Sequence, residues 1–365
     1  MKICVNTDKP YEVKMDKGLL YKIGAEVEKL KKACKVCIVT DNIVHPLYTP
    51  PLERSLIQSG FDVFKAVFSN GEEVKSMNNF KALLEYLVSQ NFDKGDLLIA
   101  LGGGTVGDLT GFAASVYHRG MDFVQVPTTL LASVDSSVGG KTAINLNQGK
   151  NLVGSFWQPL GVFIDPLCFE TLKEKDMLNG IAETVKAGII ADEVLFHLLA
   201  TTQRKDLASI LEKAIKRAII VKANIVSGDE KEEFNRQLLN LGHTLAHSLE
   251  KLSGFEIAHG LAVALGILVI SKAAHSMGWC EEDLSIILSD FYRHYGFDFS
   301  PIIGKYSPAE LAEAAQQDKK KKGNQITLSI PVGLGKCILK TVPLNLLENI
   351  FEVGFRGLGG QANGK

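Results

Sequence analysis

The sequence lacks several features that mark specialised classes of protein. Its 40 Lys and Arg are balanced by 41 Asp and Glu, so there is no basic excess of the kind that binds nucleic acid. The N-terminal stretch MKICVNTDKPYEV contains no apolar core of a secretory signal. The longest apolar run, 261–274, includes Ser271 and Lys272 and is too short to span a bilayer, which predicts a buried helix. These absences predict a cytoplasmic protein with no nucleic-acid and no membrane partner.

Cysteine is also scarce, with six residues in a chain of 365. Cys34 and Cys37 form one C-x-x-C pair, but no second pair completes a four-thiolate zinc site. Because Cys37 begins the apolar run CIVT, we expect it to pack inside a strand. Few, scattered cysteines are typical of a reducing cytoplasm.

The length and the hydrophobic pattern predict two domains. A chain of 365 residues that is 46% hydrophobic exceeds a single core. In the first half strand-like segments alternate with helix-like ones, which is typical of βαβ units and a mainly parallel sheet. Predicted strands lie at 35–41, 61–68, 96–104 and 121–129, and predicted helices at 52–60 and 80–90.

The pattern changes near residue 168. From about 172 to 311 nearly all segments have helical periodicity, clearest at 203–226 and 232–252, and 325–340 is typical of two strands joined at a Gly-rich turn. We therefore expect an α/β, Rossmann-like domain over 1–168 and a mainly α-helical domain over 169–356. The Gly-rich tail, 357–365, is expected to be disordered.

The densest polar stretch is RQLLNLGHTLAHSLEKLSGFEIAH, from 236 to 259. On one α-helix Arg236, Asn240, His243 and His247 fall at i, i+4, i+7 and i+11, on one face. The leucines between them form the apolar side, so the polar row is not a simple solvated stripe. With His259 following, the pattern favours a metal with an anionic ligand over hydrogen-bonded core histidines.

A glycine motif follows the predicted strand DLLIAL. Gly102, Gly104 and Gly107 satisfy G-x-G-x-x-G, which lets backbone amides approach a diphosphate at a helix N-terminus. Asp122 lies at about the distance of a ribose-binding acid, but it begins a strand instead of ending one, so this is a variant nucleotide site. A tight turn remains the alternative, with Asp108 at the helix entrance as a plain N-cap.

The stretch 133–151 contains GGKT, which resembles the end of a P-loop. Asp135 stands where the first glycine of a P-loop is required, which excludes a nucleoside triphosphatase. Lys141 and Lys150 could bind phosphate or carboxylate oxygens. The alternative is a Gly/Ser loop with solvated lysines.

Glu183 and Lys186 lie one turn apart on a predicted apolar helix. Alone they would be a helix-surface ion pair. With the histidines, Glu183 offers the carboxylate of a two-His, one-carboxylate site that keeps positions open for substrate. Lys222 is a further cation on an apolar helix, and the charge run 318–322, DKKKK, taken alone is typical of a solvated loop.

Taken together, these segments resemble the 3-dehydroquinate synthase family of sugar-phosphate cyclases over about residues 35–340. So many ordered blocks are a highly specific signal. The blocks are GEEVK (71–75), GGGTVGDLTGF (102–112), YHRG (117–120), VPTTLLASVDSSVGGKTAIN (126–145), GKNLVGSFWQP (149–159), GIAETVK (180–186), RQLLNLGHTLAH (236–247) and HGLAVALG (259–266).

The resemblance implies a Rossmann-like N-terminal domain, an α-helical C-terminal domain, a site in the cleft between them, and a homodimer. It implies that Glu183, His243 and His259 bind zinc or cobalt, with His247 beside them. The implied NAD contacts are Asp41, Glu72, Lys75, Gly104, Thr105, Val106, Gly107, Asp108, Thr128, Thr129, Lys141, Lys150 and Thr171. The implied substrate-binding and catalytic residues are Arg119, Asp135, Lys141, Lys150, Asn151, Lys222, Arg236, Asn240, His247 and Lys319, the last within the DKKKK run.

The family reaction converts the sugar phosphate 3-deoxy-D-arabino-heptulosonate 7-phosphate to 3-dehydroquinate and phosphate. The resemblance implies oxidation at C5 by NAD, phosphate elimination, return of the hydride, ring opening and aldol closure. In this scheme the substrate phosphate assists in removing the C6 proton, so no protein base is assigned to that step.

One position departs from the family pattern, since Leu261 stands where an acidic residue usually follows the His-Gly pair. Another sugar-phosphate cyclase, of the aminodehydroquinate or 2-deoxy-scyllo-inosose synthase type, therefore stays open. So does a metal-dependent NAD alcohol or polyol dehydrogenase, which would accumulate NADH and would not need cations at 141, 150 and 236. A non-catalytic metal- or nucleotide-binding protein is the third alternative.

Overall fold

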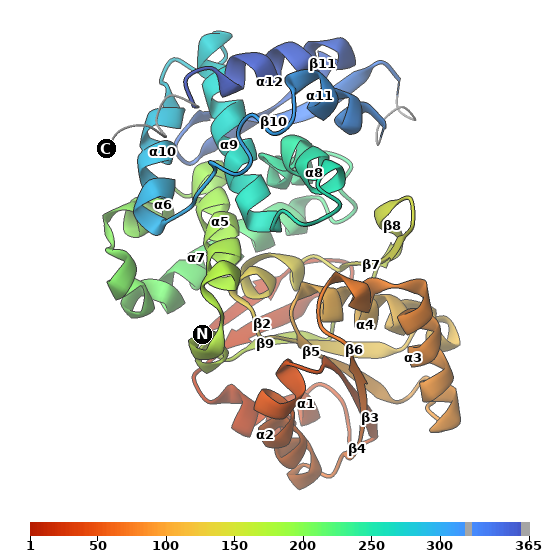
Figure 1. Ribbon diagram of the computed structural model, residues 1–365. Coiled ribbons are helices and arrows are strands. Elements are labelled where there is room, and N and C mark those ends of the chain that lie inside the picture. The colour runs from red at the N-terminus through yellow and green to blue at the C-terminus, as the bar shows by residue number, and fades with distance from the viewer. Residues whose placement is uncertain (318–322, 359–365) are drawn as a thin grey trace. The chain divides into compact units, whose positions relative to one another are not determined.

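The computed structural model describes residues 1–317 and 323–358, which form two compact units (Figure 1). The first unit consists of Met1–Met177 and Lys222–Glu230. The second consists of Leu178–Val221 and the described residues from Lys231 onward. The chain therefore contributes to the first unit twice. The domain boundary at 168/169 stays a prediction, and 359–365 of the tail lie outside the described residues.

A seven-stranded sheet organises the first unit, in the order β1-β2-β9-β6-β5-β3-β4. All neighbouring pairs are parallel except β1 and β2, which are antiparallel, so the predicted mainly parallel sheet is confirmed. In sheet order the strands are β1 (Lys2–Val5), β2 (Tyr11–Met15), β9 (Gly161–Ile164), β6 (Asp122–Pro127), β5 (Leu97–Gly102), β3 (Lys35–Asp41) and β4 (Asp62–Phe68).

The sequence explains why these strands lie inside. β5 reads LLIALG and all of it is buried, because a parallel strand covered on both faces needs an uninterrupted apolar run. Helices α3 (Met77–Ser89) and α4 (Gly104–Val116) share one apolar cluster with β3 and β5. Cys37 is buried in β3, as predicted. Two further helices, α1 (Ile23–Glu28) and α2 (Val44–Gln58), pack on each other.

A separate hairpin is formed by β7 (Lys141–Leu146) and β8 (Gly149–Phe156). No strands were predicted in this Gly-rich stretch. Short helical turns complete the first unit: η1 (Leu19–Tyr21), η2 (Glu72–Lys75), η3 (Tyr117–Arg119), η4 (Ala132–Ser136, of π type) and η5 (Pro166–Thr171).

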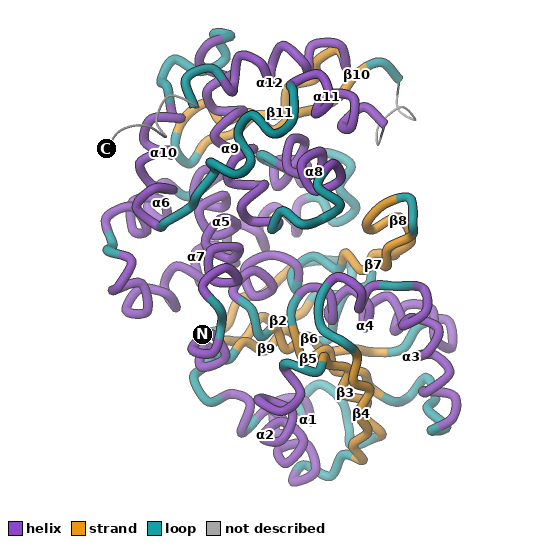
Figure 2. Tube along the Cα trace, viewed as in Figure 1, coloured by secondary structure: helices purple, strands orange, loops and turns teal. Residues whose placement is uncertain are grey.

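The second unit is mainly helical (Figure 2), as predicted. Its hairpin, β10 (Gln325–Gly333) with β11 (Lys336–Pro343), lies where two strands were expected. Two helices, α5 (Glu174–Ala191) and α7 (Leu207–Gly228), have residues in both units. The others are α6 (Glu193–Thr201), α8 (His243–Leu252), α9 (His259–Ser276), α10 (Leu284–Tyr295), α11 (Pro308–Gln317) and α12 (Leu347–Phe355), with turns η6 (Arg204–Asp206), η7 (Asn235–Asn240) and η9 (Leu344–Leu346).

Helix α9 is the core helix of the second unit. It packs against α8, α10, α12 and β10. By length and composition alone it could cross a membrane, but 72% of it is buried inside the protein. The apolar run at 261–274 is therefore a buried helix, as predicted.

The prediction of a single helix over 232–252 is wrong. The 3₁₀ turn η7 ends at Asn240, and α8 begins only at His243. Between them Gly242 has φ +79°, and a Cβ on it would lie 2.8 Å from the Val263 carbonyl oxygen. On α9, a Cβ on Gly266 would lie 2.1 Å from the Gly242 carbonyl oxygen. Because neither glycine has a side chain, the backbone at Gly242 can contact the backbone of α9 at Gly266. At Gly242 the chain leaves helical geometry, so η7 and α8 do not form one helix.

Candidate functional site

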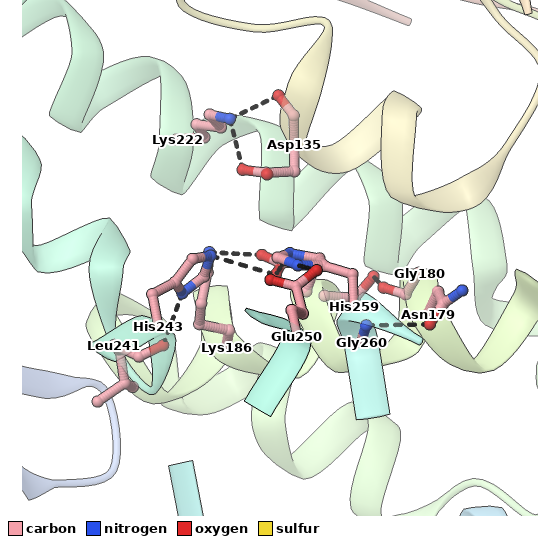
Figure 3. A network of polar contacts seen from close by, with 12 residues as sticks. Asp135, Asn179, Gly180, Lys186, Lys222, Leu241, His243, Glu250, His259 and Gly260 are labelled. Carbon is pink, nitrogen blue, oxygen red and sulfur yellow. Dashed lines mark hydrogen bonds and ion pairs between the residues drawn. The ribbon is translucent and has the colours of Figure 1, made fainter. Parts of the chain in front are cut away.

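Three side chains predicted as metal ligands converge in the helical unit. Glu183 comes from the middle of α5, and His243 and His259 are the first residues of α8 and α9. One ligand atom from each lies within 4.8 Å of the others. The Glu183 Oε1 atom is 3.3 Å from the His259 Nε2 atom and 3.8 Å from the His243 Nε2 atom. Figure 3 shows the imidazoles with their neighbours.

The chemistry of this donor set fits a divalent transition metal. Two imidazole nitrogens and one carboxylate oxygen are the ligands of catalytic zinc sites, which keep a position for substrate. The Glu183 side chain is 1% exposed, whereas the His259 side chain is 30% exposed. A cluster that is buried at Glu183 and partly exposed at His259 can bind an ion and a substrate together.

The pKa values of the two histidines are shifted in opposite directions. Burial and the ammonium group of Lys186 lower the pKa of His243 to about 3. Burial also lowers the pKa of His259, but hydrogen bonds to the carboxylates of Glu183 and Glu250 outweigh it and raise that pKa to about 10. In the absence of a metal, His259 therefore carries the proton of the cluster and His243 is neutral.

We predict that zinc binds more tightly as the pH rises. The raised pKa means that His259 keeps its proton through the neutral range and loses it only near pH 10. Zinc must displace this proton, so affinity should rise about tenfold per pH unit, with release of about one proton. Competition with a chromophoric chelator between about pH 6.5 and 8.5 measures this slope. An affinity independent of pH would contradict the proposed protonation.

Glu250 and Lys186 were not predicted as parts of this site. The Glu250 Oε1 atom lies 3.4 Å from the His259 Nδ1 atom, on the imidazole nitrogen that does not face Glu183. Carboxylates in this position fix the tautomer and orientation of a metal-binding imidazole. Lys186 forms a buried ion pair with Glu183. Its spacing could have identified Glu250 as a neighbour of the site, because it follows His243 by two helical turns on the same face of α8.

The other predicted residues of the helical unit lie on or near these elements. The ring of His247 contacts the ring of His243, with centroids 5.5 Å apart. Arg236 is 1% exposed and Asn240 is exposed; both lie on η7, and the Asn240 amide donates to Glu232 at 2.8 Å. Because Gly242 separates η7 from α8, the predicted row of four polar residues on one helical face does not form. Lys319 lies outside the described residues.

In the first unit, predicted NAD contacts gather at the carboxyl ends of neighbouring parallel strands. Asp41 ends β3 and accepts the amides of Ile43 and Val44, both at 2.9 Å. Gly104, Thr105, Val106 and Gly107 form the first turn of α4 after β5, and Thr128 and Thr129 follow β6. Ligands of doubly wound α/β sheets bind at this edge. Thr171, in η5, hydrogen-bonds the Tyr48 hydroxyl at 2.5 Å.

Asp108 is not the N-cap of α4, because that helix already begins at Gly104 with Gly103 as its cap. It lies in the second turn and pairs with the Lys75 ammonium of η2 at 2.5 Å. Burial raises the pKa of Asp108, while Lys75 acts in the opposite sense. The motif therefore positions a largely buried ion pair beside the glycine turn.

The predicted substrate-binding residues of the first unit lie on short helical turns, on α7 and on the hairpin. Lys222 forms an ion pair with Asp135 and also donates to its backbone carbonyl at 2.5 Å (Figure 3). Arg119 is exposed with φ +63°, and Lys141 is exposed at the start of β7. Lys150 and Asn151 lie on β8 and contact Glu72 and Lys75, respectively.

A parallel sheet with a glycine turn at its edge, together with a helical unit that carries a histidine–carboxylate cluster, defines the fold class of this chain. A solved 2-deoxy-scyllo-inosose synthase in complex with carbaglucose-6-phosphate, NAD⁺ and Co²⁺ matches 96% of this chain and 99% of its own, with TM-score 0.84 and 23% identity. A 2-epi-5-epi-valiolone synthase from Streptomyces hygroscopicus with NAD⁺ and Zn²⁺ matches 95% of this chain and 97% of its own, with TM-score 0.84 and 24% identity. At these identities the likeness establishes the fold alone. Sequence relatives assign the chain more narrowly, and it belongs to the 3-dehydroquinate synthase family.

Two family models carry this assignment. The N-terminal 3-dehydroquinate synthase model matches residues 65–179 and the C-terminal model matches 180–321. The 3-dehydroquinate synthase of Latilactobacillus sakei is 42% identical over 347 residues, which cover 94% of this chain and 95% of the relative. The family that the sequence motifs predicted is thus confirmed, and the protein is an enzyme of that family.

Proposed function

We propose that the protein converts 3-deoxy-D-arabino-heptulosonate 7-phosphate to 3-dehydroquinate and phosphate, using NAD and a divalent zinc or cobalt ion. The observation that supports this most directly is the convergence of Glu183, His243 and His259 in a chain of this family. NAD is accordingly assigned to the edge of the sheet formed by the ends of β3, β5 and β6. A cytoplasmic homodimer is part of the same proposal.

The roles of the residues follow from their chemistry. Glu183, His243 and His259 hold the metal, and Glu250 orients His259 through its Nδ1 atom. When bound, the metal supplies Lewis acidity toward the substrate hydroxyls, and NAD accepts and returns the hydride of an internally balanced redox reaction.

The cationic and amide groups are assigned to the two anionic ends of the substrate. Lys141, Lys150, Asn151, Arg236 and Lys222 would bind carboxylate and phosphate oxygens through charge-assisted hydrogen bonds. Arg236 suits this role because a buried guanidinium presents a fixed fork of donors to a planar or tetrahedral anion. Binding both ends places the reacting carbons relative to the cofactor and metal, so positioning and electrostatics carry most of the rate.

The curated relatives favour this function over the alternatives. The other cyclases are represented by solved structures at 23–24% identity, which carry only the fold, whereas the 3-dehydroquinate synthase of Latilactobacillus sakei is 42% identical. Leu261 is half-buried in the first turn of α9, immediately after Gly260. Its apolar side chain at this position is compatible with the same metal ligands.

A phosphate-release assay tests the proposed function. With the heptulosonate phosphate as substrate, catalytic NAD⁺ and zinc or cobalt, we expect phosphate release without net change in nicotinamide absorbance at 340 nm, the band of NADH. A chelator should stop turnover, and added metal should restore it. Accumulation of NADH in step with turnover would identify a dehydrogenase, and no phosphate release from this substrate would contradict the proposed function.

A further inference from the structure

The β7–β8 hairpin carries a bulge opposite Asn145. The ladder pairs Ile144 with Val153 and next pairs Leu146 with Gly149, so Asn145 alone stands opposite residues 150–152. Bulges of this kind turn side chains out of the regular alternation of a strand and are found beside functional sites. Here the bulged segment contains Lys150 and Asn151, two residues assigned above to ligand binding.

The bulge holds Asn151 in an unusual backbone conformation. Its φ is +57°, in the left-handed region that asparagine enters more readily than other residues with a side chain, though less readily than glycine. Contacts with neighbouring groups stabilise this conformation. One such contact is direct, because the backbone amide of Asn151 donates to the Asn145 Oδ1 atom at 3.0 Å.

The side-chain nitrogen of Asn145 contacts a residue outside the hairpin. Its Nδ2 atom donates to the Glu72 Oε1 atom at 2.7 Å. The second oxygen of Glu72, Oε2, lies 3.6 Å from the Lys150 Nζ atom. Asn145 and Lys150 thus hold the two oxygens of one carboxylate between them, and that carboxylate belongs to η2.

Asn151, in the bulge, also contacts η2. The Asn151 side-chain oxygen accepts a hydrogen bond from the Lys75 Nζ atom, which pairs with Asp108 as well. Glu72 and Lys75 begin and end η2, so the contacts form a closed circuit through Asn145, Glu72, η2, Lys75 and Asn151. Asn145 is the member that joins the two halves of this circuit, because it accepts on one side and donates on the other.

We propose that Asn145 is a positioning residue that fixes the hairpin bulge and thereby couples the cofactor contacts Glu72 and Lys75 to the substrate contacts Lys150 and Asn151. The identity of these ligands rests on the proposed function. The role requires a neutral amide, since it needs one acceptor for the Asn151 amide and one donor for the Glu72 carboxylate. Alanine supplies neither, and aspartate supplies only the acceptor.

The test compares Asn145→Ala with Asn147→Ala, a change of the same kind at an exposed residue in the turn of the same hairpin. In Asn145→Ala we expect the KM values for NAD and for the sugar phosphate each to rise about tenfold, the loss typical of a hydrogen bond to a charged group. Asn147→Ala should stay within about twofold of the wild type. Asn145→Asp keeps the acceptor for the Asn151 amide but places a second carboxylate beside Glu72, so the NAD KM should rise more than the substrate KM, a split that loss of fold would not produce.

A second measurement is independent of activity. Hydrogen exchange in the segment 149–153 should be faster in Asn145→Ala than in Asn147→Ala, because the Asn151 amide loses its acceptor. Equal KM values in the two alanine variants, or equal exchange, would overturn the inference. If the wild type released no phosphate, the proposed function would fail, while the exchange comparison would still decide whether Asn145 holds the bulge.

Discussion

His243→Ala is expected to lose zinc and, with it, turnover. His243 supplies one of three ligand atoms that lie within 4.8 Å of one another, and alanine leaves the ion with two protein ligands. Loss of an outer partner of a metal ligand costs 10- to 100-fold in metal affinity, so loss of the ligand itself should cost more than about 100-fold. Metal analysis after dialysis and a zinc competition titration measure this directly.

His247→Ala is the matched control. Its ring contacts His243 but is not among the three converging ligands. We expect this variant to retain zinc while turning over more slowly. If His243→Ala kept wild-type zinc affinity, or if the two variants lost zinc equally, the ligand assignment would be wrong. Glu183→Ala is less suitable because it would leave Lys186, 4% exposed, as a buried charge without its carboxylate partner.

Lys75→Met should lower both stability and NAD affinity. The Lys75 side chain is 5% exposed and that of Asp108 is 19% exposed, so the variant leaves a largely buried carboxylate without its ammonium partner. Breaking such a pair costs about 3–5 kcal/mol in the free energy of unfolding. Urea denaturation and NAD titration measure the two effects. Lys81→Met, at an exposed lysine of α3, should change neither.

The stability loss in Lys75→Met should depend on pH with a defined sign. Burial already raises the pKa of Asp108, and Lys75 is the group that opposes this rise. Without Lys75 the folded protein prefers the protonated acid. The free energy of unfolding of the variant is therefore closest to that of the wild type at pH values below the ordinary pKa of an aspartate. The variant loses stability as the pH rises through the raised pKa of Asp108. A deficit equal at pH 5 and pH 8 would contradict this account.

The sequence predicted the interior of the first unit well, for a physical reason. β3, β5 and β6 are mainly apolar runs bounded by polar turns, and a buried parallel strand requires that pattern. The hairpin β7–β8 was not predicted because its stretch combines glycines with polar residues and has no clean alternation. The strand β9 is only four residues long, too short for a periodic signal.

The sequence named three residues that the structure brings together, but it did not predict the local geometry around them. Motif resemblance identified Glu183, His243 and His259, which come from three different helices and meet only in the fold. Helical spacing predicted one helix through Arg236 and His247, and the structure breaks it at Gly242. At the break the Gly242 carbonyl lies against Gly266 of α9, a tertiary contact that helical spacing does not reveal. Glu250 was missed because its partner, His259, lies on the next helix.

The first unit is built from two separate segments of the chain, and this affects when it can fold during synthesis on the ribosome. Within that unit, Asp135 pairs with Lys222, Asn6 donates its backbone amide to Ser227, and Gln158 donates to Glu230. A nascent chain that has emerged only to residue 177 lacks all three partners. Domains that form as contiguous segments can fold as soon as they are synthesised. This sheet unit is complete only when residue 230 has emerged, after the whole of the intervening segment 178–221 has been translated.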